Sequence, residues 1–363
     1  MENRKVLNVG IDLGTSRSVI ATDTGIRTFI TSHVGFPKDA VSAKMFGKDM
    51  VFGEEAVQNR LALDLYRPFE GGKLKYSDSP EGETVEEHEK AKRVAKGLLN
   101  HLIELVLKDE DEDERPIIRG VLGAPALASR KNKKVILEIA DGVLDDVMIV
   151  SEPFAVAYGL DLFSSALIID IGAGTVDLCR MHGTIPTAED QITTLKAGDY
   201  VDSVFLNLIK KKYNDVNLTI NMVKRFKEEN SFLTKQGENI FIELPINGKP
   251  TQCDVTQELR SACQAIVPAI VEGVRDLVAD FDPEFQRGLK RNVILAGGGS
   301  QIVGLRKEIE LYMEETLGYG RVSTVEEPLF AGANGALLLC KDMPDDYWDQ
   351  LRTNPSAEQG PMI

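Results

Sequence analysis

The chain has 363 residues, and 57 aspartates and glutamates outnumber 42 lysines and arginines, which gives a formal net charge of −15. An acidic surface repels nucleic acid and anionic lipid, so we expect neither as a partner. No run of 18 or more residues is purely apolar, so the sequence predicts no direct membrane insertion. The four cysteines form no CxxC pair, which argues against a zinc site or a disulfide framework and favours reduced thiols in a cytoplasm.

The first predicted element is a buried strand over residues 6–14 that ends in a Gly-Thr-Ser turn, and a returning strand follows over 18–22. The same pattern recurs over 166–179 as an apolar strand, an aspartate, a glycine-rich turn and a returning strand. Asp12 and Asp170 occupy equivalent positions at the two strand ends. Two such hairpins predict two similarly built lobes, each of which offers a turn to one cleft.

Helical patterns, loops and one further hairpin fill the rest of the chain. Residues 239–246 alternate as a strand, and Asn247-Gly248 follow as a hairpin turn. Residues 71–83 predict a loop, and the acidic run 109–114 predicts a solvated loop or, alternatively, a docking site for a basic partner. A third glycine cluster, at 297–300, follows an apolar strand. The predicted helices cover 86–107, 130–140, 202–212, 256–279 and 304–317.

The glycine-rich turns and the two aspartates suit a polyphosphate with its metal ion. Glycine permits close approach of backbone N–H groups to phosphate because no Cβ intervenes, and Mg²⁺ is held by carboxylates and water. Asp12 and Asp170 are therefore the predicted metal residues. The alternative for either hairpin alone is an ordinary β-turn with a buried aspartate. Neither a GxxxxGK[ST] P-loop nor a GxGxxG helix start occurs. The predicted phosphate-binding residues are Gly14, Thr15, Ser16 and Arg17 in the first turn and Gly172, Ala173, Gly174 and Thr175 in the second.

Five motifs, in the family's order, resemble the ATPase core of actins, Hsp70 chaperones and sugar kinases. They are the two phosphate motifs at 10–16 and 170–177, the adenosine motif at 297–300, and the two connecting helices at 151–159 and 328–336. The chain is more similar still to bacterial actins, above all to MamK-like magnetosome filament proteins. The segments that carry this closer resemblance are 67–69, 71–72, 151–154, 170–175, 197–202, 227–228, 231–232 and 343–348.

The resemblance implies an actin-like α/β fold with two ribonuclease-H-like lobes around a nucleotide cleft. Residues 1–160 and 328–363 would form the first lobe, with an insert over about 35–66, and residues 161–327 the second, with an insert over about 203–253. The implied cofactors are ATP or ADP and Mg²⁺, with hydrolysis coupled to filament assembly and disassembly. The implied partners are further copies of the chain in a cytoplasmic, cytoskeletal filament, and adaptor proteins associated with magnetosomes.

The resemblance also implies roles for single residues. Glu152 would orient and partly deprotonate the attacking water, and Asp170 would bind water and metal. The alternative for Glu152 is a helix-start glutamate favoured by the helix dipole, with Ser151 as its cap. Lys227 and Glu228 would flank the base and ribose, with a charged, solvated helix face as the alternative. The residues implied to lie against the nucleotide are Gly198, Lys227, Glu228, Gly298, Gly299 and Ser300.

Two other kinds of protein with this ATPase core are alternatives. A sugar-type kinase needs a pocket for its acceptor and a base for the acceptor hydroxyl, and the sequence offers no further acidic motif for that base. An Hsp70-like chaperone needs a large peptide-binding region after the ATPase core, whereas about 27 residues follow Ala336. Phosphate release without an added acceptor, measured together with sedimentation of polymer, separates an actin from a kinase.

Overall fold

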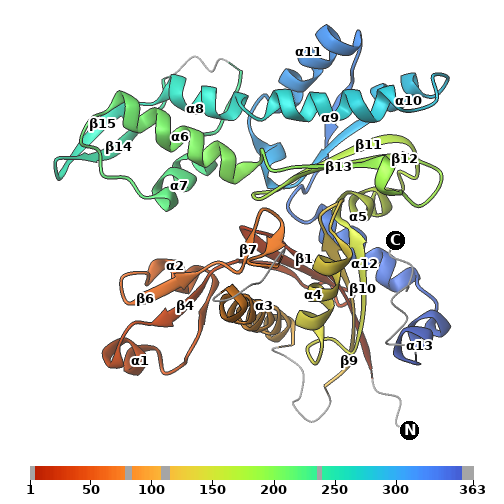
Figure 1. The fold of residues 1–363 in the computed structure, drawn as a ribbon, viewed down its shortest axis with the longest axis horizontal. Helices are drawn as coiled ribbons and strands as arrows, with labels where there is room; N and C mark the ends of the chain where they lie inside the picture. Colours follow the sequence, from red (N-terminus) through yellow and green to blue (C-terminus); the bar gives the residue numbers. More distant parts are fainter. Residues whose placement is uncertain (1–4, 78–83, 108–114, 235–238, 354–363) are drawn as a thin grey trace. The chain divides into compact units, whose positions relative to one another are not determined.

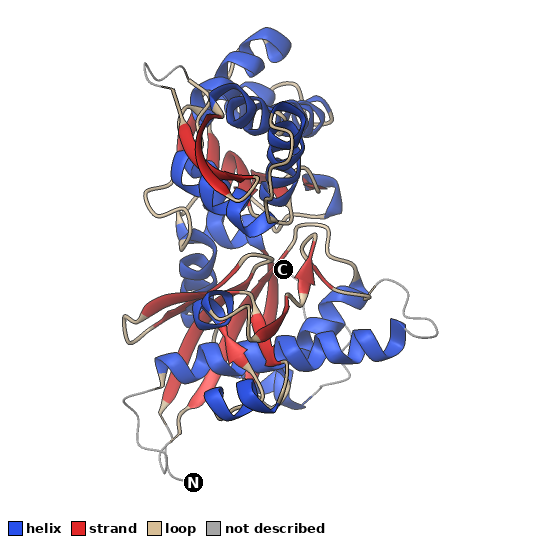
Figure 2. Ribbon diagram, turned by 90° about the vertical axis from the view of Figure 1, so that its left-hand side faces the viewer, coloured by secondary structure: helices blue, strands red, loops and turns tan. Residues whose placement is uncertain are grey.

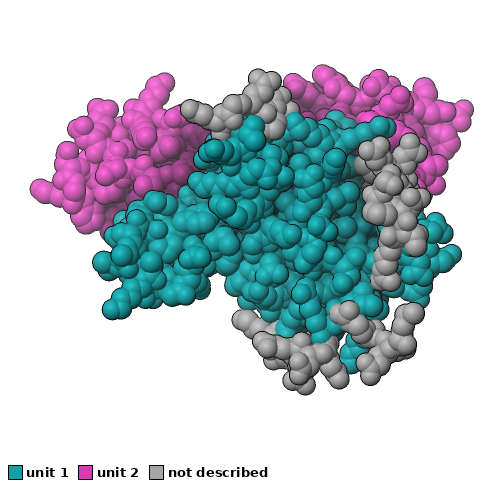
Figure 3. Space-filling model, turned by 60° about the horizontal axis from the view of Figure 1, so that its bottom comes forward, with its two compact units in different colours: residues 1–163, 329–363 teal, residues 164–328 magenta. Residues whose placement is uncertain are grey.

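The chain divides into two compact units, each with its own core (Figure 3). Unit 1 comprises Met1–Phe163 and Leu329–Ile363, and unit 2 comprises Ser164–Pro328. The acidic run at 109–114 lies outside the residues that the structure describes, so its predicted role stays a prediction. The structure is a computed structural model, and it describes residues 5–77, 84–107, 115–234 and 239–353.

Unit 1 is built on a mixed sheet of five strands, β1 (Val6–Leu13), β2 (Arg17–Thr22), β3 (Arg27–Thr31), β9 (Ile117–Ala124) and β10 (Asp146–Ser151). They lie in the order β10-β9-β1-β2-β3, and Figure 1 labels β1, β9 and β10 of this sheet. β1 pairs antiparallel with β2 and parallel with β9, which pairs parallel with β10. These strands are rich in valine, isoleucine and leucine because helices cover both faces of such a sheet.

The helices and short strands of unit 1 surround this sheet (Figure 2). Side chains of a strand alternate between its two faces. On β1, Val9 and Ile11 are buried in one core with α3 and α4, whereas Gly10 faces α12. The elements are α1 (Ala40–Phe46), α2 (Gly53–Gln58), α3 (Thr84–Val106), α4 (Arg130–Ala140), α5 (Glu152–Gly159), α12 (Ala331–Asp342), α13 (Asp345–Thr353), β4 (Val34–Pro37), β5 (Val51–Phe52), β6 (Leu63–Tyr66), β7 (Phe69–Glu70) and β8 (Lys73–Leu74).

α12 packs so closely on β1 and on α5 that only glycine fits at the contacts. A Cβ on Gly10 would overlap the carbonyl oxygen of Ala333, and one on Gly335 would overlap the carbonyl oxygen of Ala155. A Cβ on Gly159 would lie 2.8 Å from the Cα of Gly335. The two segments predicted as connecting helices therefore cross backbone against backbone within unit 1.

The C-terminal helix α13 docks on unit 1 through the single tryptophan of the sequence. The side chain of Trp348 is fully buried. The guanidinium of Arg119 on β9 lies 5.8 Å from its ring centroid. Arg119 also pairs with Asp345 at 2.6 Å and with Asp146 at 3.2 Å. One arginine thus connects α13 to two strands of the sheet.

Unit 2 repeats the sheet order of unit 1 with β11 in the place of β1. Its strands are β11 (Ser164–Ile171), β12 (Val176–His182), β13 (Gln191–Thr194), β16 (Val293–Ala296) and β17 (Val322–Thr324), in the order β13-β12-β11-β16-β17. β11 pairs antiparallel with β12 and parallel with β16. The other elements are α6 (Gly198–Lys212), α7 (Ile220–Asn230), α8 (Thr256–Gln264), α9 (Val267–Ala279), α10 (Gln286–Arg291), α11 (Leu305–Leu317), the 3-10 helices η2 (Ala188–Asp190) and η3 (Gly298–Gln301), and the hairpin strands β14 (Phe241–Ile246) and β15 (Lys249–Asp254).

Two predictions of local structure are wrong. The single helix predicted over 256–279 is two helices, α8 and α9. Pro268 lies in the first turn of α9, where its missing N–H breaks no helical hydrogen bond, so it starts a helix rather than continuing one. The loop predicted over 71–83 contains the strand β8, which pairs with β7. The Asn-Gly turn after β14 is confirmed, because both of its residues have positive φ. No helix in the described part of the chain combines the length and apolar character needed to cross a membrane.

Candidate functional site

The β11–β12 hairpin of unit 2 ends in a tight turn that the first residues of α6 hold in place. Within the turn, Gly172 donates its N–H to the carbonyl of Thr175 at 2.9 Å. Gly198 then donates its N–H to the carbonyl of Gly172 at 3.1 Å, and Asp199 donates to the carbonyl of Ala173 at 2.8 Å. A Cβ on Gly198 would lie 3.1 Å from the Cα of Ala173, so this close approach favours glycine. The structure thereby brings together the predicted residues Gly172 and Gly198.

The third glycine cluster packs against the end of β11, beside Asp170. Gly297 has a φ of 75°, and a Cβ there would overlap Oδ1 of Asp170. A Cβ on Gly299 would overlap the side chain of Ile171. Ser300 is buried, and its hydroxyl donates to the carbonyl of Gly297 at 2.8 Å. The carboxyl ends of the parallel strands β11 and β16 thus gather Asp170 and this cluster, at the usual place for a ligand in an α/β sheet. The remaining predicted residues of unit 2 are Gly174 and Thr175, buried in the turn, and Gly298, the first residue of η3.

The side chain of Lys227 on α7 points into unit 2. Its ammonium donates to the carbonyl of Gly198 at 3.0 Å and pairs with the carboxylate of Asp202 at 2.8 Å. The side chains of Lys227 and Asp202 are only 13% and 3% exposed. Burial raises the pKa of Asp202, against the opposing effect of the Lys227 charge. Glu228, the next residue, is exposed. The ammonium of Lys227 therefore bonds to the carbonyl of Gly198, and the N–H of Gly198 bonds to Gly172 in the turn. The predicted place of Lys227 beside the base stays a prediction.

The β1–β2 hairpin of unit 1 forms a turn of the same kind. A Cβ on Gly14 would lie 2.6 Å from the carbonyl oxygen of Arg17, so glycine is required there. Thr15 and Ser16 are buried in the turn. The guanidinium of Arg17 lies over the ring of Phe29 on β3, 5.7 Å from its centroid. A contact of Arg17 with phosphate stays a prediction.

Asp12 and Glu152 stand at the same edge of the unit 1 sheet. The parallel strands align Asp12 on β1 with Gly123 on β9, and Gly123 with Val150 on β10. Glu152 begins α5 directly after β10. A Cβ on Gly123 would lie 3.2 Å from Cγ of Glu152, so Gly123 leaves the space that this side chain occupies. Ser151 precedes the helix, but its side chain makes no capping hydrogen bond, so that part of the capping alternative is wrong.

A metal ion near either aspartate would need ligands from outside the protein. Within the described ranges, no group of three or more histidine, cysteine, aspartate or glutamate side chains is arranged to hold a metal. Mg²⁺ commonly takes one or two carboxylates and completes its shell with water and substrate phosphates. The strand-end aspartate beside the turn of each unit, Asp12 or Asp170, fits such an ion.

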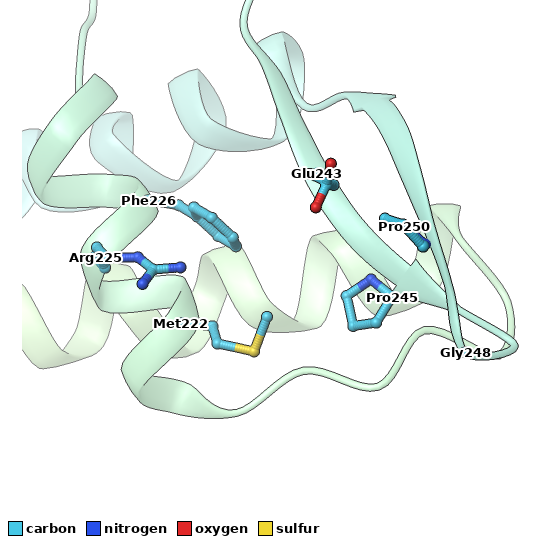
Figure 4. Close-up of a pocket in the computed structure, with 7 residues that line it drawn as sticks. All are labelled: Met222, Arg225, Phe226, Glu243, Pro245, Gly248 and Pro250. Carbon is cyan, nitrogen blue, oxygen red and sulfur yellow. The ribbon is translucent and has the colours of Figure 1, made fainter. Parts of the chain in front are cut away.

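Unit 2 also contains a cavity of about 320 Å³ (Figure 4). It is formed by α7 and the β14–β15 hairpin, and none of the predicted nucleotide residues lines it. The residues that line it are Met222, Arg225, Phe226, Glu243, Pro245, Gly248 and Pro250.

Comparison with known proteins decides the family. Residues 88–346 match the family model described as MreB/Mbl protein. The chain belongs to the MreB/Mbl family. It is 38% identical over 348 residues to the actin-like protein MamK of Magnetospirillum gryphiswaldense, an alignment that covers 95% of this chain and 92% of the relative. The predicted resemblance to MamK-like bacterial actins is thereby confirmed.

Solved structures extend the comparison to the fold of this MreB/Mbl family member. The structure of a MamK double helical filament has a TM-score of 0.86 and 36% identity, and covers 94% of this chain and 100% of the other. A non-polymerising MamK mutant bound to AMPPNP has a TM-score of 0.68 and 36% identity, and covers 93% and 100%. The predicted actin-like α/β fold is confirmed.

Sequence reasoning missed three residues that shape the site of this MreB/Mbl chain. They are Gly123, which leaves room for Glu152; Asp202, which holds Lys227; and Asn132, which lies in a cavity beside Glu152. The sequence held a signal for Asn132, because it interrupts the otherwise apolar face of the helix over 130–140.

Proposed function

We propose that this chain binds ATP and ADP with Mg²⁺, hydrolyses ATP and polymerises into a cytoskeletal filament that positions or segregates magnetosomes. A relative forms a double helical filament, and another structure of MamK holds AMPPNP, a nucleotide whose β–γ bridge resists hydrolysis. The observation in this chain that carries the proposal is the gathering of Asp170, a glycine turn, the start of α6 and a glycine cluster at the ends of β11 and β16.

The residues of each unit fit a magnesium nucleotide in charge and in space. A side chain at Gly14 or Gly172 would meet the backbone of its turn. Because glycine has no side chain, the backbone N–H groups of these turns stay accessible to phosphate. A Cβ on Gly297 would fill the space beside Asp170. Asp12 would hold the metal through water from unit 1, as Asp170 would from unit 2. When bound, Mg²⁺ neutralises charge on the phosphates during phosphoryl transfer.

Glu152 is the residue that we propose for hydrolysis. A carboxylate that accepts a hydrogen bond from the attacking water orients it and takes up part of its proton. Two observations support this role: Glu152 stands at the same sheet edge as Asp12, and Gly123 leaves its side chain room.

The finer parts of the proposal rest on the MamK relatives. Units 1 and 2 would be the two lobes, with the inserts over about 35–66 and 203–253, and Lys227 and Glu228 would flank the base and ribose. The filament would lie in the cytoplasm and engage adaptor proteins associated with magnetosomes.

Electron microscopy of the purified chain tests the assembly. We expect filaments with Mg-ATP and single molecules in a nucleotide-free control. Single molecules in both, across salt and protein concentration, would overturn the filament and favour a kinase of the same fold, to be followed by a screen of acceptors for phosphate transfer.

Substitution of Glu152 tests the hydrolysis. Glu152→Ala should bind nucleotide and assemble, but release phosphate at least about 100-fold more slowly, the usual scale for the loss of general-base help. Filaments of this variant should persist after ATP addition. Glu104→Ala, which removes the same charge from an exposed position in unit 1, should behave like the parent chain. Normal turnover in Glu152→Ala would refute the assignment.

A further inference from the structure

Asn132 on α4 has a buried amide that the protein itself does not satisfy. Its side chain is 5% exposed, and neither Oδ1 nor Nδ2 has a hydrogen-bond partner in the structure. Its backbone N–H is already taken, because it donates to Oγ of Ser129, the residue that caps α4. A buried polar group without a partner costs about 1–3 kcal/mol. An amide at such a position therefore needs a hydrogen-bond partner.

Asn132 and Glu152 both line one small cavity. The cavity leaves about 20 Å³ for the centre of a water molecule. One water occupies about 10–15 Å³ as a sphere of about 1.4 Å radius, and it needs two to four polar partners. The space is therefore large enough to hold a water molecule. The other residues that line it are Leu13, Phe69, Gly72, Lys73, Leu74, Gly123, Pro125, Ala128, Val135 and Ile136.

Among the described residues of the lining, the side chains that can hydrogen-bond to such a water are those of Asn132, Glu152 and Lys73. Most of the lining side chains are apolar, and the carboxylate of Glu152 is the one acidic group among the described residues of the lining. The amide of Asn132 supplies both a donor and an acceptor. Gly123, which lines the same cavity, also bounds Glu152, because a Cβ there would lie 3.2 Å from its Cγ. A bridge from Asn132 would therefore restrict a side chain that is already partly confined.

We propose that this cavity holds one buried water that links the amide of Asn132 to the carboxylate of Glu152, and that Asn132 is a positioning residue for hydrolysis. The inference rests on the proposed function, because it takes Glu152 as the carboxylate that orients the attacking water. The water would hydrogen-bond to the carboxylate of Glu152. Loss of the link removes one restraint on the position of this carboxylate, and small misplacements of a reacting group cost large factors in rate.

Asn132→Leu is the test substitution, because leucine keeps the branched shape of asparagine and replaces both polar atoms by methyl groups. Turnover should fall at least about 10-fold, whereas the affinity for nucleotide should stay within about twofold. The midpoint of denaturant unfolding should stay the same or rise, because leucine fills the space of the amide and leaves no buried polar group of its own. Asn100→Leu, on α3 of the same unit, is the control and should leave turnover unchanged. A purely structural Asn132 would instead lower the midpoint and leave turnover per folded molecule unchanged, which would overturn the inference.

A double variant shows whether Asn132 acts through Glu152. In the Glu152→Ala background, Asn132→Leu should cause no further loss of turnover. Additive losses would overturn the inference. Normal turnover in Glu152→Ala alone would overturn the proposed role of Glu152 and the inference with it, whereas slow Glu152→Ala with normal Asn132→Leu would overturn the inference alone.

The parent chain offers a measurement that needs no variant. A structure of the nucleotide-bound chain at a resolution that shows ordered water should place one water within hydrogen-bond distance of Asn132 and of Glu152. A dry cavity, or a water that reaches only one of them, would refute the link.

Discussion

The buried ion pair between Asp202 and Lys227 allows a sharp prediction of stability. Asp202→Ala removes the carboxylate and leaves the ammonium of Lys227 only 13% exposed and without its counter-charge. Breaking a buried pair in this way costs about 3–5 kcal/mol. Glu258→Ala is the comparison. It breaks a pair with Lys212 on α6 at 2.8 Å in which the Glu258 side chain is 15% exposed, but it leaves behind a lysine that is 38% exposed, so water can solvate the unpaired charge. Exposed pairs contribute about 0–1 kcal/mol.

Native-state hydrogen exchange of the amides of α6 and α7 measures both losses in the unit that carries the change. A difference of about 3 kcal/mol between the variants corresponds to a roughly 100-fold lower protection in Asp202→Ala than in Glu258→Ala. The variant Asp202→Leu with Lys227→Met should recover most of the loss, because it removes the unpaired charge as well. Equal protection in the two single variants, or no recovery in the double variant, would refute the reasoning.

Two further predictions concern the core of unit 1 and an acid in unit 2. Gly335→Ala should lower the free energy of unfolding by about 2 kcal/mol or more in denaturant unfolding, because its Cβ meets a backbone carbonyl. Gly97→Ala, whose Cβ meets the flexible end of Met50, should be neutral or stabilising. The reverse order of stabilities would contradict the packing. Burial alone would raise the pKa of Asp190, but hydrogen bonds from Thr187 and Arg180 lower this pKa overall. The ionised carboxylate therefore stabilises the folded chain above the ordinary pKa of 3.8, and this stabilisation is lost as the pH falls through the lower pKa of the folded state. Asp190→Asn should therefore cost about 3 kcal/mol at neutral pH, and that cost should shrink in acid, as denaturant unfolding at several pH values would show; a cost independent of pH would be evidence against an ionised Asp190.

The sequence predicted the parts of the fold and site that local patterns encode. An apolar strand that ends in Asp-apolar-Gly is one continuous segment, so the hairpins with Asp12 and Asp170 were visible without any knowledge of packing. The Asn-Gly turn and the third glycine cluster were visible for the same reason. Glu152 was found by family resemblance rather than by pattern, because a glutamate at a helix start has an ordinary electrostatic explanation.

The parts that the sequence did not predict depend on contacts between distant segments. The direction of the Lys227 side chain is set by Asp202 and by the carbonyl of Gly198 on another helix, which a charged run on α7 cannot reveal. The amide of Asn132 faces a cavity whose walls come from β1, the β7–β8 hairpin, β9 and α5. The helical periodicity could predict that Asn132 is buried, but it could not predict that Asn132 lies beside Glu152.

The docking of α13 gives this chain its own optical reporter. Tryptophan fluorescence responds to the burial of the ring, and here all of it comes from Trp348 in the contact with Arg119. Emission will therefore report whether the C-terminal helix is seated on unit 1, without a label and without interference from unit 2. A chain that assembles and turns over nucleotide can thus be monitored at its C-terminal helix during both processes.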